Sequence, residues 1–253
     1  MSRPRLPALL VATLLLCSAP AAAGVNEDMV ALDRVYVPAL VLTNRPDAEP
    51  ARRAIAALRA EWNAFRARYA VAPPGYSQAA WDRANATIEA AIVAAEKNAA
   101  AGKGPAAHDD LEAVREAQYT LRRDAGVPYF LDDLTAFHAT MERIASAVGG
   151  RNASTLTDGE VAAVRAALPE AERTWAVVVA NRAQLARHIE APERVAPERV
   201  AAAQAQIDAE SAALAALRTA VAAGDREGIA TGGNALKPGF SKLFSLFGAP
   251  ASK

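Results

Sequence analysis

Apolar side chains recur every three or four residues along nearly the whole of this 253-residue sequence. That spacing places them on one face of an α-helix, and no long segment alternates apolar and polar residues as a half-buried strand does. Alanine, the strongest helix former, is abundant, whereas runs of β-branched residues are few. Hydrophobic residues make up 52% of the chain, enough for a sizeable core. The sequence predicts an all-α, up-and-down bundle of about eight helices.

The numbers of basic and acidic residues indicate which classes of partner the protein can bind. The chain holds 28 basic (Lys plus Arg) and 28 acidic (Asp plus Glu) residues, so its formal net charge is zero. A nucleic-acid-binding protein needs a basic excess to neutralise phosphates. We therefore expect no nucleic-acid partner.

The first 23 residues are typical of a secretory signal peptide. Arg3 and Arg5 give a positive start, residues 9–17 form an apolar run, and residues 21–23 are three alanines. The apolar run is too short to span a bilayer stably. We expect cleavage after Ala23, a periplasmic or secreted protein, and no transmembrane anchor after cleavage.

Cleavage would also remove Cys17, the only cysteine. Lipoprotein processing at Cys17 is disfavoured because Leu16 stands where a small residue is needed. A mature chain without cysteine has no disulfide, no thiolate nucleophile and no covalent CxxCH haem attachment.

Capping residues predict where several helices begin. Asp47 and Ser77 are expected to cap the second and third helices. Thr157 with Glu160 forms the pattern of a capping box for the sixth helix. Each of these residues directly precedes or opens a segment with helical periodicity, so the helix starts follow from local chemistry.

Proline and glycine set the expected limits of the later helices. Pro169 is expected to break the sixth helix, and Gly232–Gly233 to lie between helices, so the last helix is expected to be short, over about residues 237–247. Its apolar face carries Phe240, Leu243, Phe244 and Phe247. Packing into the bundle is the favoured interpretation, and membrane-surface contact or partner docking is the alternative.

The two halves of the mature chain, residues 24–126 and 127–253, resemble each other in layout. Gly102 and Gly224 both end helical segments and are 122 residues apart, and Trp62 and Trp175 are 113 apart. This spacing predicts an internal repeat of two four-helix units, with nine extra residues in the second. Chance similarity between alanine-rich helices is the alternative.

One segment carries candidate metal ligands. His138, Met141 and Glu142 share a helix face, being three and four residues apart. Glu112 and Glu116, on the preceding antiparallel helix, are expected level with Glu142 and His138. A histidine with facing carboxylates can bind a divalent ion inside a bundle. The favoured interpretation is a core methionine, a boundary histidine and a solvated charge network.

Two further hypotheses involve His138. With Met29 it could supply the axial pair of a non-covalent haem. With Gln118, which is expected on the inner face of its helix, and with the nearby Arg115, it could form a polar cluster that binds a small ligand. His188, near a helix end, is expected to act as a cation that complements the helix dipole.

The sequence contains no GxSxG, HExxH or other activated-nucleophile motif, so catalysis is disfavoured. The favoured function is an exported protein that binds a partner protein or a small ligand. A metal- or haem-binding bundle is the alternative, and the cofactor, if any, is unknown.

Overall fold

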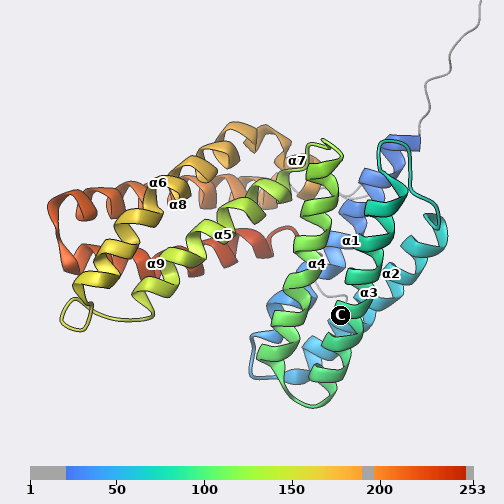
Figure 1. Cartoon of the computed structure of the whole chain (residues 1–253), viewed down its shortest axis with the longest axis horizontal. Coiled ribbons are helices and arrows are strands. Elements are labelled where there is room, and N and C mark those ends of the chain that lie inside the picture. The colour runs from blue at the N-terminus through green and yellow to red at the C-terminus, as the bar shows by residue number, and fades with distance from the viewer. Residues whose placement is uncertain (1–20, 190–196, 249–253) are drawn as a thin grey trace, which may run out of the picture.

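The computed structural model describes residues 21–189 and 197–248. Within these residues all regular structure is helical: eight long α-helices, the short helix α7 and one 3-10 turn (Figure 1). The all-α prediction is therefore confirmed. None of the described helices is both long enough and apolar enough to cross a membrane. Most of the expected signal peptide, residues 1–20, and the expected linker at 191–196 lie outside the described residues.

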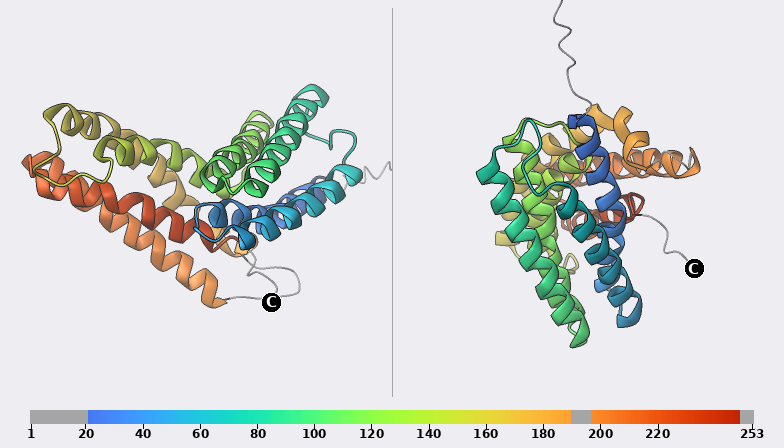
Figure 2. Two further views of the ribbon diagram at one scale, coloured as in Figure 1. Left: turned by 90° about the horizontal axis from the view of Figure 1, so that it is seen from below. Right: turned by 90° about the vertical axis from the view of Figure 1, so that its right-hand side faces the viewer.

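The first four helices pack as one group. They are α1 (Ala21–Thr43), α2 (Ala48–Arg68), α3 (Gln78–Ala100) and α4 (Gly104–Asp124). The hairpins α1–α2 and α3–α4 form two layers, which Figure 2 shows from the side. Contacts of α2 with α3 and of α1 with α4 join the layers. Short connections make consecutive helices antiparallel neighbours.

The later helices form a second group. These are α5 (Phe130–Val148), α6 (Asp158–Asn181), α8 (Pro197–Ala223) and α9 (Arg226–Ser245). The pairs α5–α6 and α8–α9 pack closely, and α5 also packs against α9. Contacts of α4 with α5 and of α1 with α9 connect the two groups. A 3-10 turn and α7 (Leu185–Ile189) follow α6.

The predicted caps are present. The side chain of Asp47 accepts a hydrogen bond from the Glu49 amide, and that of Ser77 accepts from the Ala80 amide. Thr157 and Glu160 form both bonds of the capping box. These side chains satisfy backbone N–H groups that lack a partner within their own helix, which explains why the three starts were predictable.

The predicted break at Pro169 is wrong. Helix α6 runs without interruption from Asp158 to Asn181, with Pro169 inside it. A proline inside a helix removes one backbone hydrogen bond. Buried residues on both sides, including Leu168 and Ala171, hold the helix together across this position.

The predicted start of the last helix is also wrong, because α9 begins at Arg226 and contains both Gly232 and Gly233. These glycines allow close packing rather than a turn. A Cβ atom at Gly233 would lie 2.3 Å from Val148 Cγ2, and one at Gly232 would lie 3.2 Å from Leu217 Cδ1. Helix α9 therefore approaches both α5 and α8 closely.

The apolar face near the chain end is buried, as the packing interpretation expects. Phe130 and Phe247 stack at 5.8 Å between ring centroids, and Phe240 and Phe244 stack at 5.6 Å. All four rings lie in the core. In this structure the other helices cover this apolar face, so it is not exposed at the surface.

Candidate functional site

Helices α4 and α5 bring Arg115 and His138 together. The Arg115 side chain is only 5% exposed, and its Nη2 lies 2.7 Å from His138 Nδ1. The same guanidinium is hydrogen-bonded to the Glu112 carboxylate. His138 Nε2 lies 3.3 Å from Glu142 Oε1. Because a guanidinium can only donate, Nδ1 accepts and Nε2–H faces the carboxylate.

The network continues at both ends. His108 Nε2 lies 3.4 Å from Glu112 Oε1, and Lys237 Nζ on α9 lies 2.8 Å from Glu142 Oε1. The hydrogen bond from His138, reinforced by Lys237, lowers the pKa of Glu142 to about 2 despite partial burial. Burial opposes protonation of His108, but its bonds to Glu112 and to the Leu40 carbonyl raise its pKa overall. Cations and carboxylates thus compensate one another along the network.

This arrangement does not assemble the predicted metal ligands. Glu116 is exposed, whereas Met141 is fully buried in the core. The Arg115 cation also occupies the Nδ1 side of His138. Across residues 21–189 and 197–248, no three His, Cys, Asp or Glu side chains lie close enough together to hold a metal ion.

The other two predicted participants are buried away from solvent. Gln118 lies on the buried face of α4, one turn from both Arg115 and Arg122. Met29 is in the core, with its sulfur 3.7 Å from Arg122 Nη1 and 4.0 Å from the Tyr76 hydroxyl. The Met29 sulfur is therefore engaged within the first group of helices, and nothing in its surroundings favours the haem hypothesis.

A second polar cluster, which sequence reasoning missed, lies buried where the two groups of helices meet. Arg122 donates two hydrogen bonds to Asp132, at 2.9 and 2.6 Å. Its guanidinium carbon also lies 3.9 Å from the centre of the Tyr129 ring, and the Tyr129 hydroxyl donates to Asp33 at 2.5 Å. Burial raises the pKa of Asp33 to about 6, although Arg122 and Tyr129 oppose the shift.

His188 packs against this junction and is not the predicted surface cation. It is buried, with its ring 4.5 Å from that of Tyr129, and its Nε2 accepts from the Phe130 amide at 3.4 Å. Burial, aided by the nearby Arg122, lowers the pKa of His188 to about 3. The imidazole is therefore neutral. The signal for this cluster was weak, since charged residues on helices are usually solvated.

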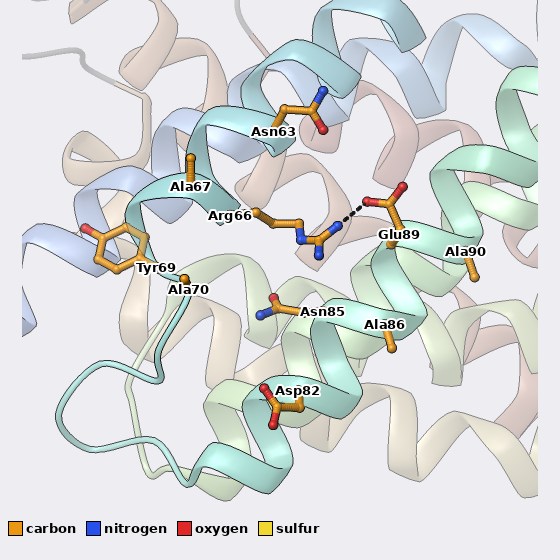
Figure 3. A pocket seen from close by; sticks show the side chains of 10 residues that line it. All are labelled: Asn63, Arg66, Ala67, Tyr69, Ala70, Asp82, Asn85, Ala86, Glu89 and Ala90. Carbon is orange, nitrogen blue, oxygen red and sulfur yellow. Dashed lines mark hydrogen bonds and ion pairs between the residues drawn. The ribbon is translucent and has the colours of Figure 1, made fainter.

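A groove lies between α2 and α3 and is lined by several polar groups. Its volume is about 710 Å³ (Figure 3). Small alanines and polar side chains share its lining, which consists of Asn63, Arg66, Ala67, Tyr69, Ala70, Asp82, Asn85, Ala86, Glu89 and Ala90.

Glu89 organises one end of the groove. Its carboxylate accepts from Trp62 Nε1 at 2.9 Å, from Arg59 Nη1 at 2.7 Å and from Arg66 Nη1 at 2.8 Å. Burial alone would raise the pKa of Glu89, but these three donors lower it. Arg66 is thereby held across the gap between the helices, as the dashed line in Figure 3 shows.

Other polar groups of the groove are unused. Among the described residues, neither the Asn63 nor the Asn85 amide has a hydrogen-bond partner, and Arg66 employs only Nη1. Asp82 uses only Oδ1, which accepts from Gln78 at 2.7 Å. The groove therefore presents free donors and acceptors to a polar molecule. None of its lining residues is a nucleophile paired with a base.

The aromatic layer beneath the groove is tightly packed. Trp62 and Phe65 stack at 5.8 Å between ring centroids, and Trp81 lies 5.9 Å from Phe65. Trp81 Nε1 donates to the Tyr69 carbonyl at 3.0 Å. The sequence analysis did not foresee the polar groove above these tryptophans. The available signal was the polar residues that flank the two buried stripes, Asn63 beside Trp62 and Asn85 beside Ala84.

A smaller hollow of about 360 Å³ lies between α6 and α8. Its lining includes Leu168, Pro169 and Val221, together with the ion pair between Glu172 and Arg218 at 3.4 Å. Apart from this pair it presents mainly apolar side chains. The α2–α3 groove is therefore the better candidate for recognising a polar ligand.

Comparison of the chain with protein-family models, with curated proteins and with solved structures finds no match.

Proposed function

We propose that this protein acts by binding and that the groove between α2 and α3 is its ligand site. The observation that carries the proposal is the set of unused hydrogen-bonding groups on Asn63, Arg66 and Asn85, gathered in one open groove. Elsewhere the main polar clusters are internally paired, as Arg122 is with Asp132. The charged start and apolar run of residues 1–23 support action in the periplasm or outside the cell.

We also infer that the two groups of helices are copies of one four-helix unit. Equal spacing supports the inference, since α4 begins at Gly104 and α9 at Arg226, which are 122 residues apart. The same shift relates buried Ile92 to buried Leu214. In the preceding helices a shift of 113 relates every buried residue of α2 to a buried residue of α6, including Trp62 to Trp175.

This correspondence strengthens the case for the groove. At the positions that match Asn63 and Arg66, the second unit has Ala176 and Val179, and Asn85 is matched by Ile207. Ile207 is fully buried. A four-helix unit of this kind thus forms without polar side chains at these positions, so their presence on α2 and α3 calls for another explanation, and ligand binding provides one.

Tryptophan fluorescence offers a direct test. Trp62 and Trp81 lie under the groove, so replacing the third tryptophan by Trp175→Phe leaves reporters only at the site. In this background we would titrate glutamate, trialanine, maltotriose and citrate. At least one is expected to change the fluorescence and raise Tm, and Asn85→Leu is expected to abolish both effects.

The matched control is Arg173→Gln, which alters an exposed ion pair of the second unit and is expected to leave binding unchanged. Failure of all four compounds to bind would overturn the proposal. Binding that persists unchanged in both the Asn63→Leu and Asn85→Leu variants would also overturn it.

A further inference from the structure

We infer that the α2–α3 groove takes an extended peptide segment of about three residues that carries a carboxylate. This inference rests on the proposed function and specifies its ligand. From Asp82 to Ala90 the α3 wall spans eight residue steps, about 12 Å at the rise of an α-helix. An extended chain advances about 3.3 Å per residue, so about three residues fit along this wall.

The unused amides match the main chain of such a segment. An asparagine side chain presents a carbonyl acceptor beside an N–H donor, as a peptide group does. Asn63 lies on α2 and Asn85 on α3, so the two walls each supply one amide (Figure 3). Each amide can therefore accept from one backbone N–H and donate to one backbone carbonyl of a chain between the helices.

Small side chains allow the main chain of the ligand to come close. Four alanines line the groove and carry nothing beyond Cβ: Ala67 on α2, Ala70 just after the end of α2, and Ala86 and Ala90 on α3. The faces of Trp62 and Trp81 are fully buried below them, so no indole ring is available to stack on a sugar. This lining favours a peptide backbone over a carbohydrate.

Arg66 supplies the preference for a carboxylate. Its Nη1 is committed to Glu89 at 2.8 Å, which leaves Nε and Nη2 without a partner among the described residues. Two guanidinium N–H groups can donate together to one carboxylate. Glu89 is itself held by Trp62 and Arg59, so Arg66 is positioned before the ligand arrives. The carboxylate can belong to an acidic side chain or to a peptide C-terminus.

Isothermal titration calorimetry of the purified protein tests the inference with four probes. They are acetyl-Ala-Glu-Ala-amide, its Gln analogue, trialanine with a free carboxyl group, and maltotriose. The Glu peptide or trialanine is expected to bind at least tenfold more tightly than the Gln peptide. Binding by the Glu peptide identifies a side-chain carboxylate, and binding by trialanine alone identifies a C-terminus.

Variants connect the binding to the groove. Arg66→Gln is expected to remove the difference between the Glu and Gln peptides, and Asn63→Leu to weaken both at least fivefold. Asn63 and Arg66 are exposed, so neither substitution disturbs the core. Arg52→Gln, on the same helix but outside the groove, is the matched control and is expected to leave affinity unchanged.

The outcomes separate this inference from the proposal beneath it. Tighter binding of maltotriose than of either carboxylate peptide, sensitive to Asn63→Leu, would overturn the peptide ligand and leave the groove as the binding site. Equal affinity for the Glu and Gln peptides, with no binding of trialanine, would overturn the role of Arg66. Binding indifferent to both variants would overturn both the inference and the proposed function. No binding by any of the four probes would overturn the inference, and the proposed function would also fall if glutamate and citrate did not bind.

Discussion

The two groups of helices, which we propose to be copies of one four-helix unit, each bury a tryptophan with a different hydrogen-bond acceptor. In the first unit, Trp62 on α2 donates its indole N–H to Glu89 on α3 at 2.9 Å. In the second unit, Trp175 on α6 donates to Ser211 on α8 at 2.8 Å, at the corresponding positions. The shared requirement is an acceptor for a buried indole, and either a carboxylate or a hydroxyl meets it.

The ion pair one turn away makes the same point. Arg59 on α2 pairs with Glu96 on α3 at 2.9 Å. The corresponding residues of α6 and α8 are Glu172 and Arg218, which pair at 3.4 Å with the charges exchanged. Opposite charges meet at this position in both units, whereas the sign on each helix is free to change.

At other positions the two proposed units carry different types of side chain. The first has a polar groove outside and an apolar Ile88 inside, whereas the second has a buried carboxyl, Glu210, at the position that matches Ile88. Glu210 is 2% exposed, and its Oε1 has no hydrogen-bond partner within the described residues. A Cβ at Gly239 would meet the other carboxylate oxygen, so glycine provides its space. The two proposed units therefore each have their own polar features.

Removing the buried ion pair between the units should have the largest effect. Arg122 is 2% exposed and corresponds to Phe244 in the second unit. Arg122→Ala leaves the Asp132 carboxylate buried without its partner and should lower the free energy of unfolding by about 4 kcal/mol. Urea denaturation followed by circular dichroism measures the change. The double variant Arg122→Met with Asp132→Leu should recover much of the loss, and a single-variant loss below about 1 kcal/mol would contradict the assignment.

Glu210 should make stability depend on pH. Burial raises its pKa in the folded protein from the ordinary 4.5 to about 8. Between these values the folded state holds a proton that the unfolded state has released, so stability falls as pH rises, by up to about 1.4 kcal/mol per unit. From pH 5 to pH 7.5 the loss should reach about 3 kcal/mol.

Glu210→Gln, which cannot ionise, should remove this component from the pH profile of unfolding. It should also raise stability near pH 8 and change it little near pH 4. The neighbouring exposed Glu198→Gln serves as the control on the same helix. Identical pH profiles for the wild type and Glu210→Gln would show that this carboxyl does not ionise differently on folding.

Phe244 tests whether the second unit relies on aromatic packing where the first uses Arg122. Its ring is buried and stacks on Phe240. Phe244→Ala should cost on the order of 3 kcal/mol through lost burial and the cavity it leaves. Thermal unfolding is the measurement, with exposed Lys242→Ala as the control. An unchanged Tm would instead favour a docking role for the apolar face of α9.

The exchanged ion pair should give the smallest effect. Glu172→Arg or Arg218→Glu alone places like charges together and should cost about 0.5 kcal/mol, because the pair is partly exposed. Combining them recreates the polarity of Arg59 and Glu96 and should restore stability. A double-mutant cycle measures the coupling energy. Additive losses in the double variant would show that the two side chains do not interact in solution.

One feature of the polar network, the proximity of charged side chains on α4 and α5, could be predicted from local rules. Counting outward from the turn between α4 and α5 predicted Glu116 level with His138 and Glu112 level with Glu142. In the structure it is Glu112 that is connected to His138, through Arg115. The metal hypothesis placed Glu116 in the same group, but it faces solvent. Residue types and spacing along two helices do not determine how each helix is rotated against its neighbour.

The sequence by itself determined the fold class and most helix limits. Caps such as Thr157 with Glu160, and stripes such as Phe137 to Val148, act within a few residues and can be read along one helix. The predicted helix break at Pro169 and the predicted loop at Gly232–Gly233 were wrong. At these positions tertiary contacts outweigh the local preference of proline and glycine.

Only the tertiary structure decided which charged residues are buried and where a groove opens. Arg122 and Asp132 meet inside, and Asn63 on α2 and Asn85 on α3 line one groove. These outcomes depend on the rotation and separation of whole helices, which many distributed side-chain contacts set together. Local periodicity predicts that a helix has a buried face. Which residue each side chain at the edge of that face contacts is set only when the helices pack.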